Sequence, residues 1–158
     1  MIILGIDPGT SIVGFGVIKK DGSNLMCQEY GCIKTTPKIP DVEKLSLIRS
    51  ELDDLIKKIK PDQISIEKLF FFKNAKTVIS VAQARGVIIS VCAQNNITPK
   101  EFTPLQIKQA VSCYGRAGKS EVQKMVKLIL NLKEIPKPDD AADALACAIT
   151  CANFTRFQ

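Results

Sequence analysis

The sequence contains no histidine, and this absence excludes several kinds of chemistry. A chain without histidine cannot build a zinc site that needs an imidazole ligand. By itself it also cannot form the Ser–His or Cys–His arrangements of many hydrolases. Any chemistry that this chain performs must therefore use carboxylates, lysines or a bound metal ion.

Cysteine motifs are also missing. The six cysteines contain no Cys-x-x-Cys spacing. Cys147 and Cys151 lie four residues apart in a helical pattern, which favours a role as small, buried apolar side chains. Because nothing indicates a disulfide framework, we expect a protein of the reducing cytoplasm.

Long hydrophobic runs are absent as well. A membrane-spanning helix needs roughly 18 uncharged residues, and the longest apolar candidate, residues 77–94, is interrupted by Gln83 and Arg85. Met1 leads directly into an apolar segment without a basic start or cleavage site, so we expect no signal peptide. The chain shows no internal repeat, linker or low-complexity tract. We therefore expect a single domain over residues 1–158.

The charges that are present favour one kind of partner. Twenty-two Lys and Arg residues against 16 Asp and Glu residues give a formal net charge of +6. Such an excess favours an anionic partner, nucleic acid first.

The hydrophobic pattern predicts an α/β domain. Strands are expected at residues 2–7, 12–20, 25–35, 63–67 and 97–103. Helices are expected at 42–60, at about 74–95, from Leu105, from Lys119 with Ser120 and Gln123 as a capping box, and at 138–152. The first three strands follow each other through short turns. They predict an antiparallel meander, extended by parallel strands that helical crossovers reach.

Acidic residues stand at the ends of two expected strands. Asp7 closes the first strand and Glu67 closes the strand at 63–67. If these strands are parallel neighbours, the two carboxylates emerge side by side at the sheet edge where α/β proteins bind ligands. Asp140 and Asp143 share one face of the last helix, whose alanines allow a close approach to the sheet. Each acid alone is more typical of a turn or a helix cap.

A cluster of these four carboxylates would either shift its pKa values upward or bind cations. Two unit charges 4 Å apart repel by about 4 kcal/mol at an effective dielectric constant of 20. Hard oxygen ligands without histidine or thiolate select Mg²⁺ or Mn²⁺. A pair of such ions hydrolyses phosphodiesters in many nucleases. The acids therefore suggest the hypothesis of a two-metal nuclease.

Four segments carry a resemblance to a known family. "GIDPGTSIVGFGVI", "ISIEKLFFFKNAKTVISVAQARGVI", "FTPLQIKQAVSCYGRAGKSEVQKMV" and "DDAADALACAIT" resemble, in order, the blocks of the RuvC family of bacterial Holliday-junction resolvases. The resemblance implies an RNase H-like mixed five-stranded sheet flanked by helices. It also implies a homodimeric, Mg²⁺-dependent endonuclease that cuts two opposing strands of a four-way DNA junction in recombination and repair. A branch-migration complex of the same pathway is the further partner implied.

The resemblance also assigns roles to individual residues. The implied catalytic acids and metal ligands are Asp7, Glu67, Asp140 and Asp143. Asp140 is preferred to Asp139 because "DAAD" matches the motif without a gap. The implied DNA contacts are Lys108 and Lys119 near the scissile phosphate, and Phe70 as an aromatic that probes the junction. The apolar helix at 74–95 is either a buried core helix or the homodimer seam.

Other interpretations compete with this one. "CYGRAGKS" imitates a nucleotide-binding loop, but Cys113 stands where the first glycine belongs. The "DPGT" segment is similar to the phosphate loop of the actin and sugar-kinase class, which needs two such domains. Another RNase H-like nuclease, acting on RNA–DNA hybrids or ribosomal RNA, is a further alternative. A non-catalytic junction-binding protein is disfavoured because all four acids are present.

Overall fold

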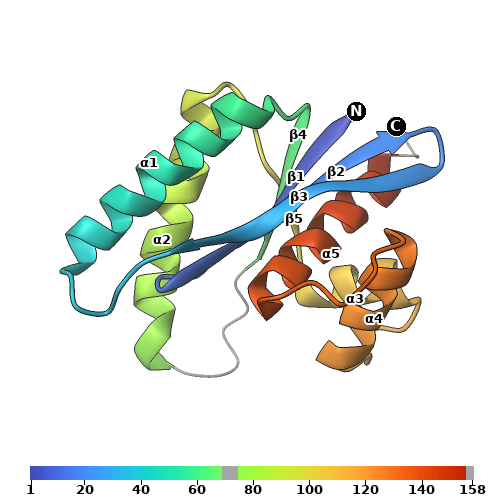
Figure 1. The fold of residues 1–158 in the computed structure, drawn as a ribbon. Coiled ribbons are helices and arrows are strands. Elements are labelled where there is room, and N and C mark those ends of the chain that lie inside the picture. Colours follow the sequence, from blue (N-terminus) through green and yellow to red (C-terminus); the bar gives the residue numbers. More distant parts are fainter. Residues whose placement is uncertain (69–74, 156–158) are drawn as a thin grey trace.

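The computed structural model describes residues 1–68 and 75–155 of the chain (Figure 1). The strands are β1 (Ile2–Asp7), β2 (Ile12–Asp21), β3 (Asn24–Lys34), β4 (Gln63–Glu67) and β5 (Lys100–Phe102). The helices are α1 (Asp41–Ile59), α2 (Ala75–Gln94), α3 (Pro104–Ser112), α4 (Lys119–Ile129) and α5 (Asp139–Phe154).

The strands form one mixed sheet in the order β3-β2-β1-β4-β5. The meander β1-β2-β3 is antiparallel, while β4 pairs in parallel with both β1 and β5. Helices α1 and α2 cover one face of the sheet, and α3, α4 and α5 lie on the other (Figure 1). The expected mixed five-stranded sheet with flanking helices is therefore confirmed.

Glycines in β1 and β2 let α5 lie directly on the sheet. A Cβ atom at Gly5 would overlap the backbone of Ala144, and one at Gly14 would overlap the backbone carbonyl of Asp140. Neither position tolerates a side chain without a shift of the helix. The close approach follows from small residues on both elements, and it brings the first turn of α5 to the end of β1.

One local prediction was right in kind but too long, and another was wrong. The expected strand at 97–103 is reduced to the three residues of β5. Helix α4 begins after Gly118, whose backbone N–H donates to a carboxylate oxygen of Glu121 at 3.2 Å. Ser120 therefore lies inside the helix, and the expected box with Gln123 does not form, because the extended backbone of Gly118 ends the preceding loop two residues earlier.

Other features agree with the composition. Cys147 and Cys151 are buried free thiols, as expected. Within residues 1–68 and 75–155, no helix is both long and apolar enough to cross a membrane.

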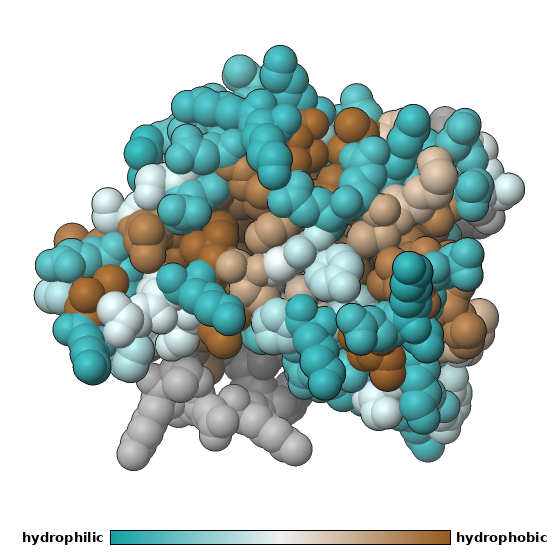
Figure 2. Space-filling view, viewed as in Figure 1, coloured by the Kyte–Doolittle hydropathy of each residue, from teal (hydrophilic) through white to brown (hydrophobic). Residues whose placement is uncertain are grey.

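Figure 2 shows hydrophilic side chains over the outer side of α1 and hydrophobic side chains near the middle of the same face. The surface drawn there is thus mixed rather than one continuous apolar patch.

Candidate active site

Asp7 and Glu67 lie at the ends of neighbouring parallel strands. The register pairs Ile6 of β1 with Ile66 of β4, so Asp7 and Glu67 are the next residues on the two strands. The side chains of a parallel pair in register point to the same face of the sheet. The expectation that these two strands are parallel neighbours is confirmed, and it places the two acids side by side.

Helix α5 brings two more acids to this edge. Its N-cap residue is Pro138, which makes no side-chain cap, and Asp139 and Asp140 lie in its first turn. An acid at this position complements the helix dipole, and Asp143 follows one turn later. Because the backbone of Asp140 rests on Gly14 of β2, the first turn of the helix is held against the end of the meander.

The acids interact electrostatically, and the pKa of Asp7 shows it. Burial is the largest cause that raises the pKa of Asp7 well above its usual range. The carboxylates of Glu67, Asp143 and Asp140 raise it further, in that order, while Lys119 opposes them. Asp7 is thus within electrostatic range of the other three predicted acids.

The pKa of Glu67 is raised from 4.5 to about 7. Burial is the main cause and the carboxylate of Asp143 adds to it, whereas Lys119 and Lys108 act in the opposite direction. Burial likewise raises the pKa of Asp143, against the lowering effect of its hydrogen bond with Lys119. Bringing these carboxylates together therefore costs free energy near neutral pH, which is typical of functional sites.

Lys119 bridges two acids of α5. Its Nζ lies 3.1 Å from Oδ2 of Asp143 and 3.4 Å from Oδ2 of Asp139. Burial lowers the pKa of Lys119, but the two carboxylates outweigh it and the net pKa is raised. Asp139 thus belongs to the site through Lys119. The Asp139–Asp140 doublet was the only signal for it in the sequence.

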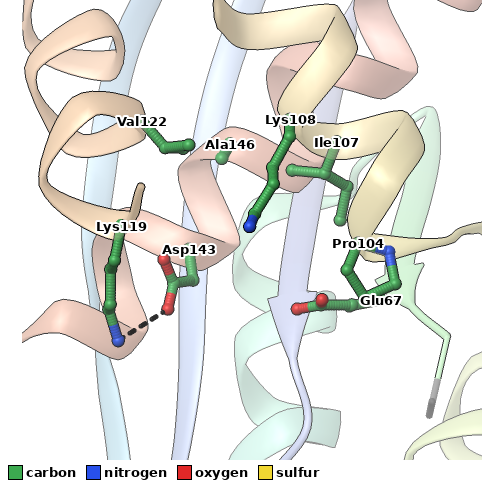
Figure 3. Close-up of a pocket in the computed structure, with 8 residues that line it drawn as sticks. All are labelled: Glu67, Pro104, Ile107, Lys108, Lys119, Val122, Asp143 and Ala146. Atoms are coloured by element: carbon green, nitrogen blue, oxygen red, sulfur yellow. Dashed lines mark ion pairs between the residues drawn. The ribbon is translucent and has the colours of Figure 1, made fainter. Parts of the chain in front are cut away.

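A cavity of about 180 Å³ opens beside these residues. It is lined by Glu67, Pro104, Ile107, Lys108, Lys119, Val122, Asp143 and Ala146. Figure 3 shows the ammonium group of Lys108 directed toward the space between the carboxylates of Asp143 and Glu67. The cavity therefore presents two lysine ammonium groups beside two carboxyl groups, so groups of both charges face the same space.

The site is not preassembled around a metal ion. In the described part of the chain, no three His, Cys, Asp or Glu side chains stand in a geometry that could hold one. Asp7 and Asp140 do not line the cavity, and Asp143 is engaged by Lys119. The donor chemistry nonetheless fits a hard divalent cation, since the ligands are carboxylates and their mutual repulsion is relieved when a cation binds.

Two other sequence predictions have different outcomes. Phe70 lies outside the described residues. The "CYGRAGKS" segment follows helix α3 and leads into α4, so it lacks the strand that a nucleotide-binding loop requires. The expectation that no strand precedes this segment is confirmed.

The strand order, the paired acids and the final acidic helix together define an α/β protein of the RNase H-like class. The fold is shared with the yeast mitochondrial Holliday junction resolvase, which aligns with a TM-score of 0.70 at 12% sequence identity over 94% of this chain and 76% of that one.

Comparison with known proteins narrows the class to one family. The model of the family described as "Crossover junction endodeoxyribonuclease RuvC" matches residues 3–151. The protein of that name from Halothermothrix orenii is 53% identical over 100% of this chain and 96% of its own length. Thermus thermophilus RuvC in complex with Holliday junction substrate aligns with a TM-score of 0.94 at 32% identity, covering 99% of this chain and 96% of that one. The chain belongs to the RuvC family, whose members use divalent metal ions.

Proposed function

We propose that this protein is a Holliday-junction resolvase. It hydrolyses phosphodiester bonds symmetrically on two opposing strands of a four-way DNA junction, in homologous recombination and DNA repair. Residues 1–158 act as a single RNase H-like nuclease domain. The proposal rests mainly on the pair Asp7 and Glu67 at the ends of parallel strands, faced by the acids of α5, in a chain of the RuvC family.

The four acids are the proposed metal ligands. Asp7, Glu67, Asp140 and Asp143 would hold two Mg²⁺ ions, with Mn²⁺ as a substitute. When bound, such ions lower the pKa of an attacking water and offset charge on the phosphate. For the protein, the raised pKa of Glu67, about 7, means that its proton must leave before the carboxylate can bind a cation.

The two lysines of the cavity are the proposed phosphate contacts. Lys108 is directed into the cavity, and a cation there neutralises negative charge that develops during hydrolysis. Lys119 lines the same cavity, and its ammonium group is held by Asp143 and Asp139. If Asp143 turns to a divalent cation, Asp139 keeps Lys119 at the site. For Phe70, the family resemblance supports a contact with the DNA bases at the crossover.

The outer face of α2 supports a homodimer. Ala84, Ile88 and Val91 are buried in the core, but Ile79 on the opposite side is 71% exposed. The same exposed side carries Gln83 and four short side chains over the next turns of the helix: Ala82, Gly86, Ser90 and Ala93.

Packing against the described residues does not explain Gly86. A Cβ atom placed there would have no described atom within 4 Å, although glycine inside a helix costs roughly 1 kcal/mol relative to alanine. Close packing against a second copy of α2 accounts for the short side chains, and two linked active sites account for paired cuts. A branch-migration complex is the further partner that family membership supports.

The test is a cleavage assay with Mg²⁺ on three substrates: a synthetic four-way junction, a linear duplex and an RNA–DNA hybrid. We expect symmetric nicking of the junction alone. Asp7→Asn should abolish cutting and preserve junction binding, since it removes a ligand and a repulsive charge together. Asp54→Asn, an exposed change on α1, serves as the control and should leave both unchanged.

Cleavage of the hybrid alone would reject the resolvase in favour of another RNase H-like activity. Loss of both binding and folding in Asp7→Asn would make Asp7 a structural residue instead.

A further inference from the structure

A second cavity adjoins the first, and no role in metal binding or phosphate contact explains it. It has a volume of about 320 Å³ and is lined by Pro104, Leu105, Lys108 and Gly115. Pro104 and Lys108 also line the cavity that contains Glu67 and Asp143. The two cavities are therefore adjacent, with Pro104 and Lys108 between them. The volume lies at the lower end of the range of about 300–1,000 Å³ that is typical of ligand pockets.

One wall of this second cavity is the rigid first turn of α3. The backbone N–H of Gln106 donates to Oγ1 of Thr103 at 3.2 Å, and the N–H of Thr103 donates to the side chain of Gln106 at 2.8 Å. This reciprocal capping box immobilises the turn that carries Pro104 and Leu105. The sequence-based expectations did not include this box.

The opposite wall depends on a glycine. A Cβ atom at Gly115 would lie 2.6 Å from Cδ1 of Leu105 and 3.2 Å from Cγ of Gln109. The loop between α3 and α4 therefore lies close against Leu105, and a side chain at residue 115 would displace the end of the leucine side chain. Its neighbour Tyr114 is 57% exposed, and its backbone carbonyl accepts from Ala117 N–H at 3.1 Å, which closes the loop into a turn.

The chemistry of the walls indicates the occupant. Leu105 is 55% exposed at the cavity, and no acidic side chain is among its described lining residues. Lys108 lines it, and Lys119 lines the adjoining cavity. A surface that is apolar at its floor and cationic at one side complements a strand that carries apolar bases between phosphates.

We propose that this cavity, which we call the Leu105 subsite, receives a nucleobase of the DNA strand next to the bond that is cut. The inference rests on the proposed function, because it places the scissile phosphate at Lys108 in the first cavity. A base adjoining that phosphate then lies against Leu105 and Pro104, with Lys108 holding the phosphate between the two cavities. The subsite thus fixes the position of the cut strand along its axis.

The experiment combines a protein change with a DNA change. Leu105→Ala is compared with Leu128→Ala, the same substitution at a residue of α4 that is 69% exposed and lines neither cavity. Each protein cuts a normal junction and junctions with an abasic nucleotide immediately 5′ or 3′ of the scissile phosphate, in single-turnover assays. Thermal midpoints confirm that both variants fold, as their exposure predicts.

We expect Leu105→Ala to cut the normal junction about fivefold more slowly, because the truncation removes apolar surface that the base covers. One of the two abasic junctions should slow the wild-type protein by a similar factor. On that junction Leu105→Ala should lose little more, because both changes remove the same contact. Leu128→Ala should behave as wild type.

The inference is overturned if Leu105→Ala cuts like Leu128→Ala, or if the abasic and Leu105→Ala losses simply multiply. Failure of the proposed function looks different, since the wild-type protein would then cut no junction at all.

Discussion

Replacing Glu67 with glutamine should stabilise the protein when no divalent cation is present. Folding raises the pKa of this carboxyl from 4.5 to about 7, through burial and through repulsion by Asp143. The folded protein therefore holds the proton more tightly than the unfolded chain. It loses stability as the pH rises from about 4.5 to about 7, and the loss is complete above that range.

The magnitude follows from the size of the pKa change. Each pKa unit corresponds to about 1.36 kcal/mol, so ionised Glu67 lowers the free energy of unfolding by at most about 3 kcal/mol at pH 8. Glutamine carries no charge at any pH and avoids this cost. The gain of Glu67→Gln over wild type should therefore be up to about 3 kcal/mol larger at pH 8 than at pH 4.5. Comparing the two pH values cancels effects of the amide that do not depend on pH.

Urea unfolding with a chelator, at pH 4.5 and pH 8, measures this difference. Glu29→Gln is the matched control, because Glu29 is well exposed and pairs with Lys58 at the surface. Such a pair contributes about 0–1 kcal/mol, so the control should change little. Adding Mg²⁺ at pH 8 should then stabilise wild type more than Glu67→Gln, since a ligand that binds the folded state stabilises it.

The reasoning is refuted if Glu67→Gln has the same effect at both pH values, or if it destabilises the chelated protein more at pH 8 than at pH 4.5. The expected result would show that the ionised Glu67 carboxylate lowers the stability of the folded protein when no cation is bound.

Three further predictions concern packing, assembly and Lys119. Gly14→Ala should lower the free energy of unfolding by at least about 1–3 kcal/mol, because its Cβ overlaps the backbone of α5. In thermal unfolding, Gly118→Ala is the control, since a Cβ there has open space, and its midpoint should fall far less. Equal changes in the two midpoints would refute the close packing. Gly86→Leu should leave the fold intact and convert a dimer into a monomer in light scattering; an unchanged mass contradicts the proposed seam. Asp139→Asn should slow junction cleavage by less than about fivefold, the limit for an exposed ion pair on Lys119, whereas a complete loss would make Asp139 itself a ligand.

Much of the fold was predictable because its signals are local. The strand ending at Asp7, the strand ending at Glu67 and the helix starting near Asp139 agree with the sequence pattern to within a residue or two. Each is an apolar run or an amphipathic helix bounded by turn residues, and such patterns need no knowledge of distant contacts. The boundary at Ser120 failed because serine and glycine compete for the same N-cap position.

The pairing of acids was predictable for a different reason. A strand, a helical crossover and a second strand favour a parallel pair, so the order of elements along the chain is enough to expect Asp7 and Glu67 side by side. The upward direction of their pKa changes was predictable from mutual repulsion. The largest cause was not, because it is burial, which depends on what covers the strand ends.

The sequence by itself thus determined the order of strands and helices, the family, and the residues that carry charge at one sheet edge. All of these follow from local hydrophobic patterns and from the spacing of motifs along the chain. The tertiary structure alone decided that Lys119 lies between Asp139 and Asp143, and that a second cavity opens between Leu105 and Gly115. Both arise where α3, α4 and α5 meet. Contacts between side chains on separate elements depend on distances that no local pattern of residues records.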